Sequence, residues 1–172
     1  TLRSGSTNDI FVTKYDADGN HLWSTSIGTL ESDIGYCITA DPSGNVIVTG
    51  YLHGVVPSDI IIMKYNAAGA LQWIKIISST EGYDEGLSVA TDSAGNVLVT
   101  GSFSGTVDFG GGPLSTSGDE WDAFVAKYSP GGAHLWSQRF GDVDLEAGLC
   151  IKADAADNVL VAGYFAGTVS FG

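Results

Sequence analysis

Acidic residues that recur once in each repeat are the side chains of this sequence with the clearest capacity for chemistry. Asp33, Asp84 and Glu146 each lie two residues before a glycine, in three stretches of similar sequence. Carboxylates that converge in an acidic ring can bind a cation or a basic ligand. A carboxylate can equally cap its own loop by accepting hydrogen bonds from backbone amides. The residue types alone fit both roles.

A second candidate site lies beside the longest connection between predicted strands. Twenty residues separate Gly101 from Asp122, and binding residues concentrate on loops that a rigid scaffold holds. We therefore expect Asp119, Glu120 and Trp121 to contact a ligand. The alternative is that Trp121 only covers an edge of the sheet.

Other motifs indicate structure rather than catalysis. Residues 16–20 (DADGN) resemble the start of a calcium loop, but no spaced glutamate follows, and the same turn reads NAAGA and SPGGA elsewhere. We expect a hairpin turn there, with calcium as the alternative. The sequence shows no serine–histidine–aspartate pattern, phosphate loop or convergent histidine set. We assign no catalytic residue, no metal ligand and no cofactor.

A lysine and an aspartate also recur at fixed places. A lysine in a strand that is buried on both sides needs an apolar surface for its stem and a partner for its ammonium group. We expect an ion pair with a recurring aspartate, which itself bonds its own turn. The lysines are Lys14, Lys64 and Lys127, and the aspartates are Asp41, Asp92 and Asp154.

Composition limits the kinds of partner. The chain has 172 residues, 44% of them hydrophobic, with 24 glycines and 4 prolines, which fits one folded segment over residues 1–172 with many turns. Twenty acidic residues oppose seven basic ones, giving a net charge of -13. Such a field repels nucleic acid and anionic membranes.

No apolar run approaches the roughly 20 residues of a membrane-spanning helix. Because the chain begins with Thr1 inside a repeat, we expect a mature or excised piece of a longer protein.

The two cysteines occupy matching repeat positions. Cys37 and Cys150 each follow a glycine by two residues, and the middle repeat has Ser88 there. Matching positions of different repeats are expected to lie farther apart than the roughly 7 Å between Cα atoms that a disulfide tolerates. We expect two free thiols, mostly buried.

A long internal repeat predicts the fold. DIFVTKYDADGNHLW at 9–23 matches DIIIMKYNAAGALQW at 59–73 and DAFVAKYSPGGAHLW at 122–136. The repeat units span about 9–58, 59–121 and 122–172. Each holds four short strand candidates joined by turns rich in Gly and Asn, and adjacent strands joined this way run antiparallel. A period of about 40 to 50 residues with several strands is typical of a propeller blade. We predict an all-β propeller segment of about twelve strands in four-stranded antiparallel blades, about three blades' worth.

These motifs resemble a known family. The pattern DxFVxKYxxxGxxLW, followed downstream by ADxxGNVxVxGY, resembles the bacterial β-propeller repeats called SBBP, which are similar in style to NHL-type repeats. By that analogy the chain begins with two outer strands at 9–27 and ends with two inner strands at 148–164. Complete blades lie between them at about 36–77 and 86–140. Residues 105–118 (GTVDFGGGPLSTSG) look like a linker of such arrays. The family pattern implies large exported or surface proteins and supplies no catalytic residue.

The sequence therefore predicts a non-enzymatic module for binding a protein or ligand, or for assembly, in an extracellular or surface-associated bacterial protein. Two alternatives stay open: a glycan-binding propeller, and a metal-dependent enzyme whose acidic ring lies in the propeller mouth. The expected partner is a protein or a glycan, with no membrane insertion. Since propellers have about four to eight blades, we expect a homo-oligomer or a longer repeat array to complete the ring.

Overall fold

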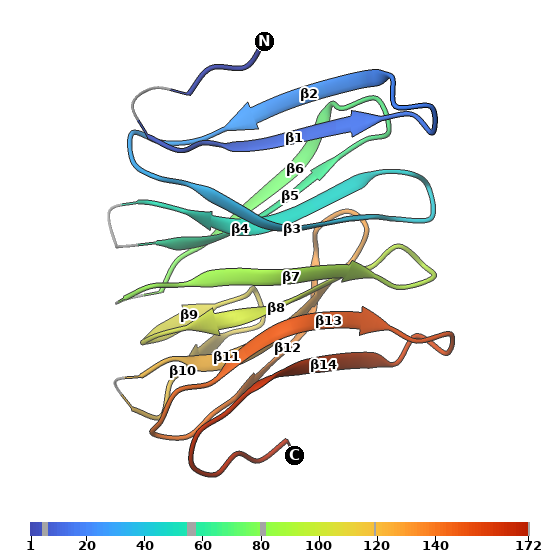
Figure 1. Ribbon diagram of the computed structural model, residues 1–172. Helices are drawn as coiled ribbons and strands as arrows, with labels where there is room; N and C mark the ends of the chain where they lie inside the picture. Colours follow the sequence, from blue (N-terminus) through green and yellow to red (C-terminus); the bar gives the residue numbers. More distant parts are fainter. Residues whose placement is uncertain (5–6, 55–57, 80–81, 119, 172) are drawn as a thin grey trace.

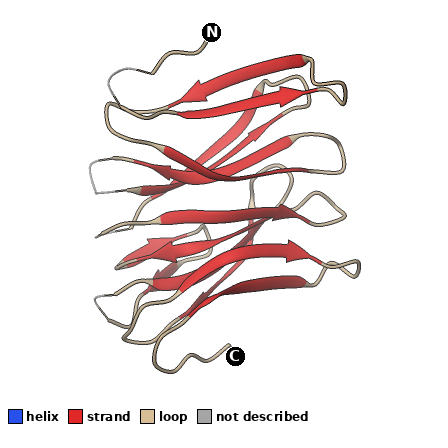
Figure 2. Ribbon diagram, viewed as in Figure 1, coloured by secondary structure: helices blue, strands red, loops and turns tan. Residues whose placement is uncertain are grey.

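The fold is built from strands and turns. The computed structural model describes residues 1–4, 7–54, 58–79, 82–118 and 120–171, and no helix occurs among them (Figure 2). It follows that none of the described residues belongs to a helix able to cross a bilayer. The prediction of an all-β chain is confirmed.

Two complete four-stranded blades form the middle of the molecule. All neighbouring strands in them are antiparallel. The first blade contains β3 (Ile34–Ala40), β4 (Val46–Leu52), β5 (Asp59–Tyr65) and β6 (Leu71–Ile77). The second blade contains β7 (Glu85–Thr91), β8 (Val97–Phe103), β11 (Asp122–Tyr128) and β12 (His134–Phe140).

Two half-blades flank the complete blades at opposite ends of the stack (Figure 1). The N-terminal half-blade pairs β1 (Ile10–Tyr15) with β2 (His21–Ile27), the outer strands of a blade. The C-terminal half-blade pairs β13 (Ala147–Ala153) with β14 (Val159–Tyr164), the inner strands. The predicted division of the chain into blades is confirmed, and the sheets do not close into a ring.

The structure adds a hairpin that the sequence did not predict. It consists of β9 (Thr106–Asp108) and β10 (Pro113–Ser115), so the described residues form fourteen strands rather than about twelve. The Asp108 carboxylate holds its turn by accepting hydrogen bonds from the amides of Gly110 and Gly112 at 2.7 and 3.0 Å. Residues 105–118 were predicted as a linker, and this was wrong because they carry two core side chains.

Those side chains complete the main core, between the first and second blades. Val107 and Phe109 are buried there together with Phe103 and Phe124. The rings of Phe109 and Phe124 stack with centroids 4.5 Å apart, and Phe103 packs edge-on against both. Aromatic packing of this kind contributes beyond the area it buries.

A buried ion pair lies in each complete blade, as predicted. The Lys64 ammonium lies 2.9 Å from the Asp41 carboxylate, and Lys127 lies 2.8 Å from Asp92. The side chains of Lys64 and Asp41 are only 2% and 4% exposed. Lys14 lies in the N-terminal half-blade, which lacks the strand that leads into the aspartate turn.

The cysteines are unbonded, as predicted, but they are not both buried. Cys37 is half-buried and Cys150 is exposed. The Cys37 sulfur lies 3.9 Å from the Ser88 hydroxyl of the next blade, whereas the described chain places no further blade beyond Cys150. Matching positions of adjacent blades nevertheless bring their side chains close together, as Cys37 and Ser88 show. Cys37 and Cys150 stay apart because the second blade separates them.

The buried ion pair yields a test of stability. Replacing Lys64 by alanine leaves the Asp41 carboxylate buried without its charge partner, which should lower the free energy of unfolding by about 3–5 kcal/mol. Urea titration of the variant measures this loss. Lys75→Ala is the control within the same blade, because Lys75 lies over the Tyr128 ring, 5.1 Å from its centroid, an interaction of about 0.5–1 kcal/mol. Equal losses in the two variants would contradict the role of the ion pair.

Candidate functional site

The two ends of the blades differ in the loops that they carry. The short turns at 16–20, 41–45, 66–70, 92–96, 129–133 and 154–158 lie at one end of the strands; those at 16–20, 41–45, 92–96 and 154–158 are on the right in Figure 1. The linkers between blades and the β9–β10 hairpin lie at the other end, which we call the long-loop face. The five described residues that were predicted to bind a ligand, Asp33, Asp84, Glu120, Trp121 and Glu146, belong to segments of this face.

Three of those residues link loops through buried carboxylates. Asp33 accepts hydrogen bonds from the amides of Thr29 and His53, at 2.8 Å for His53. Asp84 accepts from the amides of Ser79 and Ser104 at 2.8 and 3.1 Å. Each aspartate thus joins the linker before its blade to the loop that follows the second strand.

Glu146 repeats this arrangement beside the C-terminal half-blade. Its carboxylate accepts a hydrogen bond from the Asp142 amide at 3.2 Å. Asp33, Asp84 and Glu146 are 1%, 0% and 1% exposed. The structure therefore shows loop-linking carboxylates that a ligand reaches only if the loops open, and cation capture by an acidic ring stays a prediction.

Burial changes the acidity of these groups. Burial raises the pKa of Asp84 to about 6, although hydrogen bonds from Ser79 and Ser104 act in the opposite direction. Burial also raises the pKa of Glu146 and of Asp122. Asp122 forms an ion pair with Arg139, which the sequence analysis did not single out.

No group of three or more His, Cys, Asp or Glu side chains able to hold a metal occurs among the described residues.

The other predicted site residues lie at the rim of the long-loop face. Trp121 is half-buried, and its ring centroid lies 6.3 Å from that of Tyr83, which is 51% exposed. Glu120 is exposed, and Asp119 lies outside the described residues. Sequence analysis missed Tyr83 as a partner of Trp121, because the two residues lie in different connections and no pattern links them.

Residues 16–20 form the hairpin turn that the sequence predicts. The Asp16 carboxylate accepts hydrogen bonds from the amides of Asp18 and Asn20 and from the Asn20 side chain at 3.0, 2.8 and 2.9 Å. These hydrogen bonds, the one from the Asn20 side chain foremost, lower the pKa of Asp16. Asp41, Asp92 and Asp154 bond their own turns in the same way. Calcium binding at Asp16 is not tested by these contacts.

Comparison with known proteins agrees with this architecture. Residues 72–102 match the family model SBBP, a Beta-propeller repeat. This segment runs from β6 to β8, so the resemblance seen in the sequence is confirmed there.

One curated protein and one solved structure match most of the chain. "Uncharacterized WD repeat-containing protein L264" of Acanthamoeba polyphaga mimivirus is 27% identical over 196 residues, covering 90% of this chain. The chain spans only 14% of the length of that protein. A crystal structure of a protein of unknown function from Bacteroides caccae matches with a TM-score of 0.48 and 18% identity, covering 85% of this chain and 43% of the other.

The raised pKa of Asp84 gives a pH test of the loop-linking carboxylates. Because its folded-state pKa of about 6 exceeds the ordinary aspartate pKa of 3.8, the folded state binds the proton more tightly. The free energy of unfolding should therefore rise as the pH falls from about 7 to about 4, by on the order of 2 kcal/mol from this group. Asp84→Asn should remove that rise, as measured by thermal unfolding at a series of pH values.

Asp16→Asn is the control for this pH series. The pKa of Asp16 is lowered by its turn, so its stabilising effect is lost only as the pH falls below the unfolded-state value of about 4. The control should keep the rise between about pH 7 and about pH 4. An unchanged rise in Asp84→Asn would contradict the assignment of this effect to Asp84.

Proposed function

We propose that this β-propeller repeat chain is a non-enzymatic binding module whose partner is a protein that docks on the long-loop face. The observation that carries the proposal is the Tyr83–Trp121 aromatic pair at the rim of that face. Aromatic side chains are enriched in binding hot spots because they bury a large area at low cost in conformational entropy.

The scaffold beneath the pair supports this role. The amide of Glu146 donates a 2.8 Å hydrogen bond to the Trp121 carbonyl, and the Asp84 carboxylate fixes the linker that carries Tyr83. Preorganised contacts lose less entropy on binding than mobile ones. The exposed Glu120 beside the pair favours a partner with basic residues around an apolar anchor.

The proposed setting is an exported or surface-associated bacterial protein, which rests on the resemblance to SBBP repeats. The second candidate is a glycan-binding propeller, and the same aromatic pair favours it because sugars also stack on aromatic rings. If calcium takes part, binding of the protein partner or of the glycan should depend on the calcium concentration. No observation on the described residues favours the metal-dependent enzyme.

A selection experiment tests the proposed function. Peptides displayed on phage are selected against the 172-residue chain, and the affinity of each selected peptide is measured by calorimetry. Trp121→Ala should weaken binding at least about tenfold, as expected for truncation of a hot-spot aromatic. Peptides that bind Trp121→Ala as tightly as the unmodified chain would contradict the proposal.

Two controls separate the candidates. Pro42→Ala alters an exposed residue of a short turn at the opposite end of the blades and should leave the affinity unchanged. A glycan array, run with and without calcium on the same variants, identifies the alternative. A glycan signal that Trp121→Ala abolishes, without any selected peptide, would replace the protein partner by a glycan.

A further inference from the structure

Three pairs of acidic residues lie where neighbouring blades meet. Each pair joins the aspartate at the start of the third strand of one blade to the loop-linking carboxylate before the next blade. The pairs are Asp9 with Asp33, Asp59 with Asp84, and Asp122 with Glu146. In every pair the backbone amide of the second residue donates to the carbonyl of the residue before the first, at 2.8, 3.2 and 2.8 Å. The pairs therefore recur with the blades.

The two carboxyl groups of the first pair meet beside a glycine. Asp9 Oδ1 and Asp33 Oδ2 both lie against the Cα atom of Gly28, where a Cβ would collide with the Asp9 oxygen and lie 3.0 Å from the Asp33 oxygen. Like charges this close disfavour each other's ionised form.

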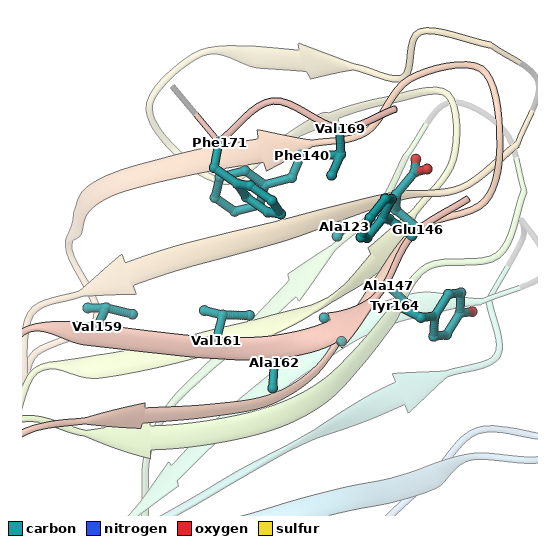
Figure 3. A pocket seen from close by; sticks show the side chains of 13 residues that line it. Ala123, Phe140, Glu146, Ala147, Val159, Val161, Ala162, Tyr164, Val169 and Phe171 are labelled. Carbon is teal, nitrogen blue, oxygen red and sulfur yellow. The ribbon is translucent and has the colours of Figure 1, made fainter. Parts of the chain in front are cut away.

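The pair before the C-terminal half-blade has the same geometry. A Cβ at Gly141 would lie 2.5 Å from Asp122 Oδ1 and 2.6 Å from Glu146 Oε2. Glu146 also lines one hollow together with Ala123, the residue that follows Asp122 in β11 (Figure 3). The close approach of the two carboxyl groups is therefore a property of the repeat.

The pair between the two complete blades contains a buried oxygen that lacks a donor. Asp59 Oδ1 has no hydrogen-bond partner among the described residues, and Asp59 and Asp84 are 9% and 0% exposed. Both oxygens of Asp84 already accept amide hydrogen bonds, from Ser79 and Ser104. A buried acceptor without a donor costs free energy, and so does a buried pair of like charges. A single proton between the two carboxyl groups would remove both costs.

We infer that Asp59 and Asp84 share one proton, which makes the contact between the first and second blades sensitive to pH. The pair takes this proton from solvent and so loses one of its two negative charges. The protonated carboxyl group then donates a hydrogen bond to the carboxylate of its neighbour. This proton site does not depend on the proposed function.

An arginine distinguishes the next pair along the chain. Arg139 forms an ion pair with Asp122. In the first blade Ile76 holds the position of Arg139, since each lies opposite the residue two places after the aspartate. Asp59 therefore has an isoleucine where Asp122 has its cation, so a proton is needed more at this pair than at the next.

The groups around Asp84 favour the shared proton. Burial is the main cause that raises the pKa of Asp84 to about 6; hydrogen bonds from Ser79 and Ser104 lower this pKa, and the charge of Asp59 raises it. Among the described residues, Asp59 is the charged group that acts on Asp84. The neighbouring Glu85 carboxylate accepts a hydrogen bond from a tyrosine hydroxyl of β3 at 3.2 Å.

A metal ion suits this position less well than a proton. Calcium takes roughly six to eight oxygen ligands, whereas amide hydrogens from two loops point at the oxygens of Asp84. Amide hydrogens carry a partial positive charge and repel a cation. The position between the two carboxyl groups is therefore assigned to a proton.

The shared proton stabilises the folded chain at acidic pH. Because the folded pair binds the proton more tightly than the unfolded chain does, the stabilisation is complete below about pH 4 and is lost as the pH rises through about 6. Above that pH two buried charges oppose each other at the linker that Asp84 ties to the loop after β8. Tyr83 directly precedes Asp84, so docking on the long-loop face should weaken there, a consequence that rests on the proposed function.

Amide resonances of the two donors test the shared proton directly. The amides of Ser79 and Ser104 sense the ionisation of Asp84, because a hydrogen bond to a carboxylate is stronger than one to a neutral carboxyl group. In amide NMR spectra over a pH series, both resonances should titrate with a midpoint near 6. Asp59→Asn should lower this midpoint by at least about one pH unit, toward the ordinary aspartate pKa of about 4. A smaller shift would mean that burial alone raises the pKa, and would overturn the sharing.

An arginine in the first blade provides a second variant. Ile76→Arg places a guanidinium group where Arg139 stands in the second blade, and it should lower the midpoint because it stabilises the charged form of Asp59. Ile74→Arg is the matched control, since it lies on the same face of β6 but opposite Met63, farther from Asp59 in the register. It should change the midpoint much less. Equal shifts in the two variants, or none in Ile76→Arg, would contradict the inference.

Calcium chloride and EDTA distinguish a proton from a metal ion. The midpoint reported by the two amides should be the same after either addition. A midpoint that falls with calcium and recovers with EDTA would place a metal ion between the carboxyl groups and would overturn the inference.

Peptide affinity tests the consequence for docking separately. A peptide selected on the long-loop face should bind more tightly at about pH 5 than at about pH 8, and Asp59→Asn should remove this difference. An affinity independent of pH, beside the expected NMR result, would reject the control of docking while the proton site stands. Failure to select any peptide that depends on Trp121 would instead reject the proposed function.

Discussion

The pairing of the second strand with the third in each blade supports the rest of the structure. These strands, β4 with β5 and β8 with β11, are buried along almost their whole length. A strand pair buried on both faces needs a neighbouring blade on each side, so no blade of this kind is stable alone. The same pairs position the short turns at one end and the long loops at the other. Loop geometry at the candidate site therefore depends on them.

A buried charge at the centre of an apolar sheet has a structural consequence. Successive side chains of a strand point to opposite faces, so a slip of one residue would move every side chain to the other face. Lys64 reaches both Asp41 within its own blade and the Pro130 carbonyl of the next blade. One side chain thus links the register within a blade to the position of the next blade. An apolar residue of the same volume would pack there without specifying either.

Much of the fold and little of the site could be predicted from the sequence. The threefold repeat predicted the strands, their division into blades and the lysine–aspartate pair, because all of these depend on recurring side chains. Strands β9 and β10 were missed because three residues are too few to show a period. The sequence offered both loop capping and cation binding for Asp33 and Asp84 but could not choose between them, because their partners are backbone amides, which have no signature in the sequence. The exposure of Cys150 was missed because it depends on which blade lies beside it.

The acidic composition acquires a different meaning once the contacts are known. Many of the acidic residues accept hydrogen bonds from backbone amides of turns or linkers, among them Asp16, Asp33, Asp41, Asp84 and Asp92. These carboxylates serve the fold, and a neutral residue without acceptor oxygens could not replace them. A net charge of -13 is then in large part a by-product of a repeat that terminates its strands with aspartate. For the proposed partner, the charge that matters is that of the exposed acidic residues at the long-loop face, and this local pattern, rather than the total charge, would determine which surface can dock there.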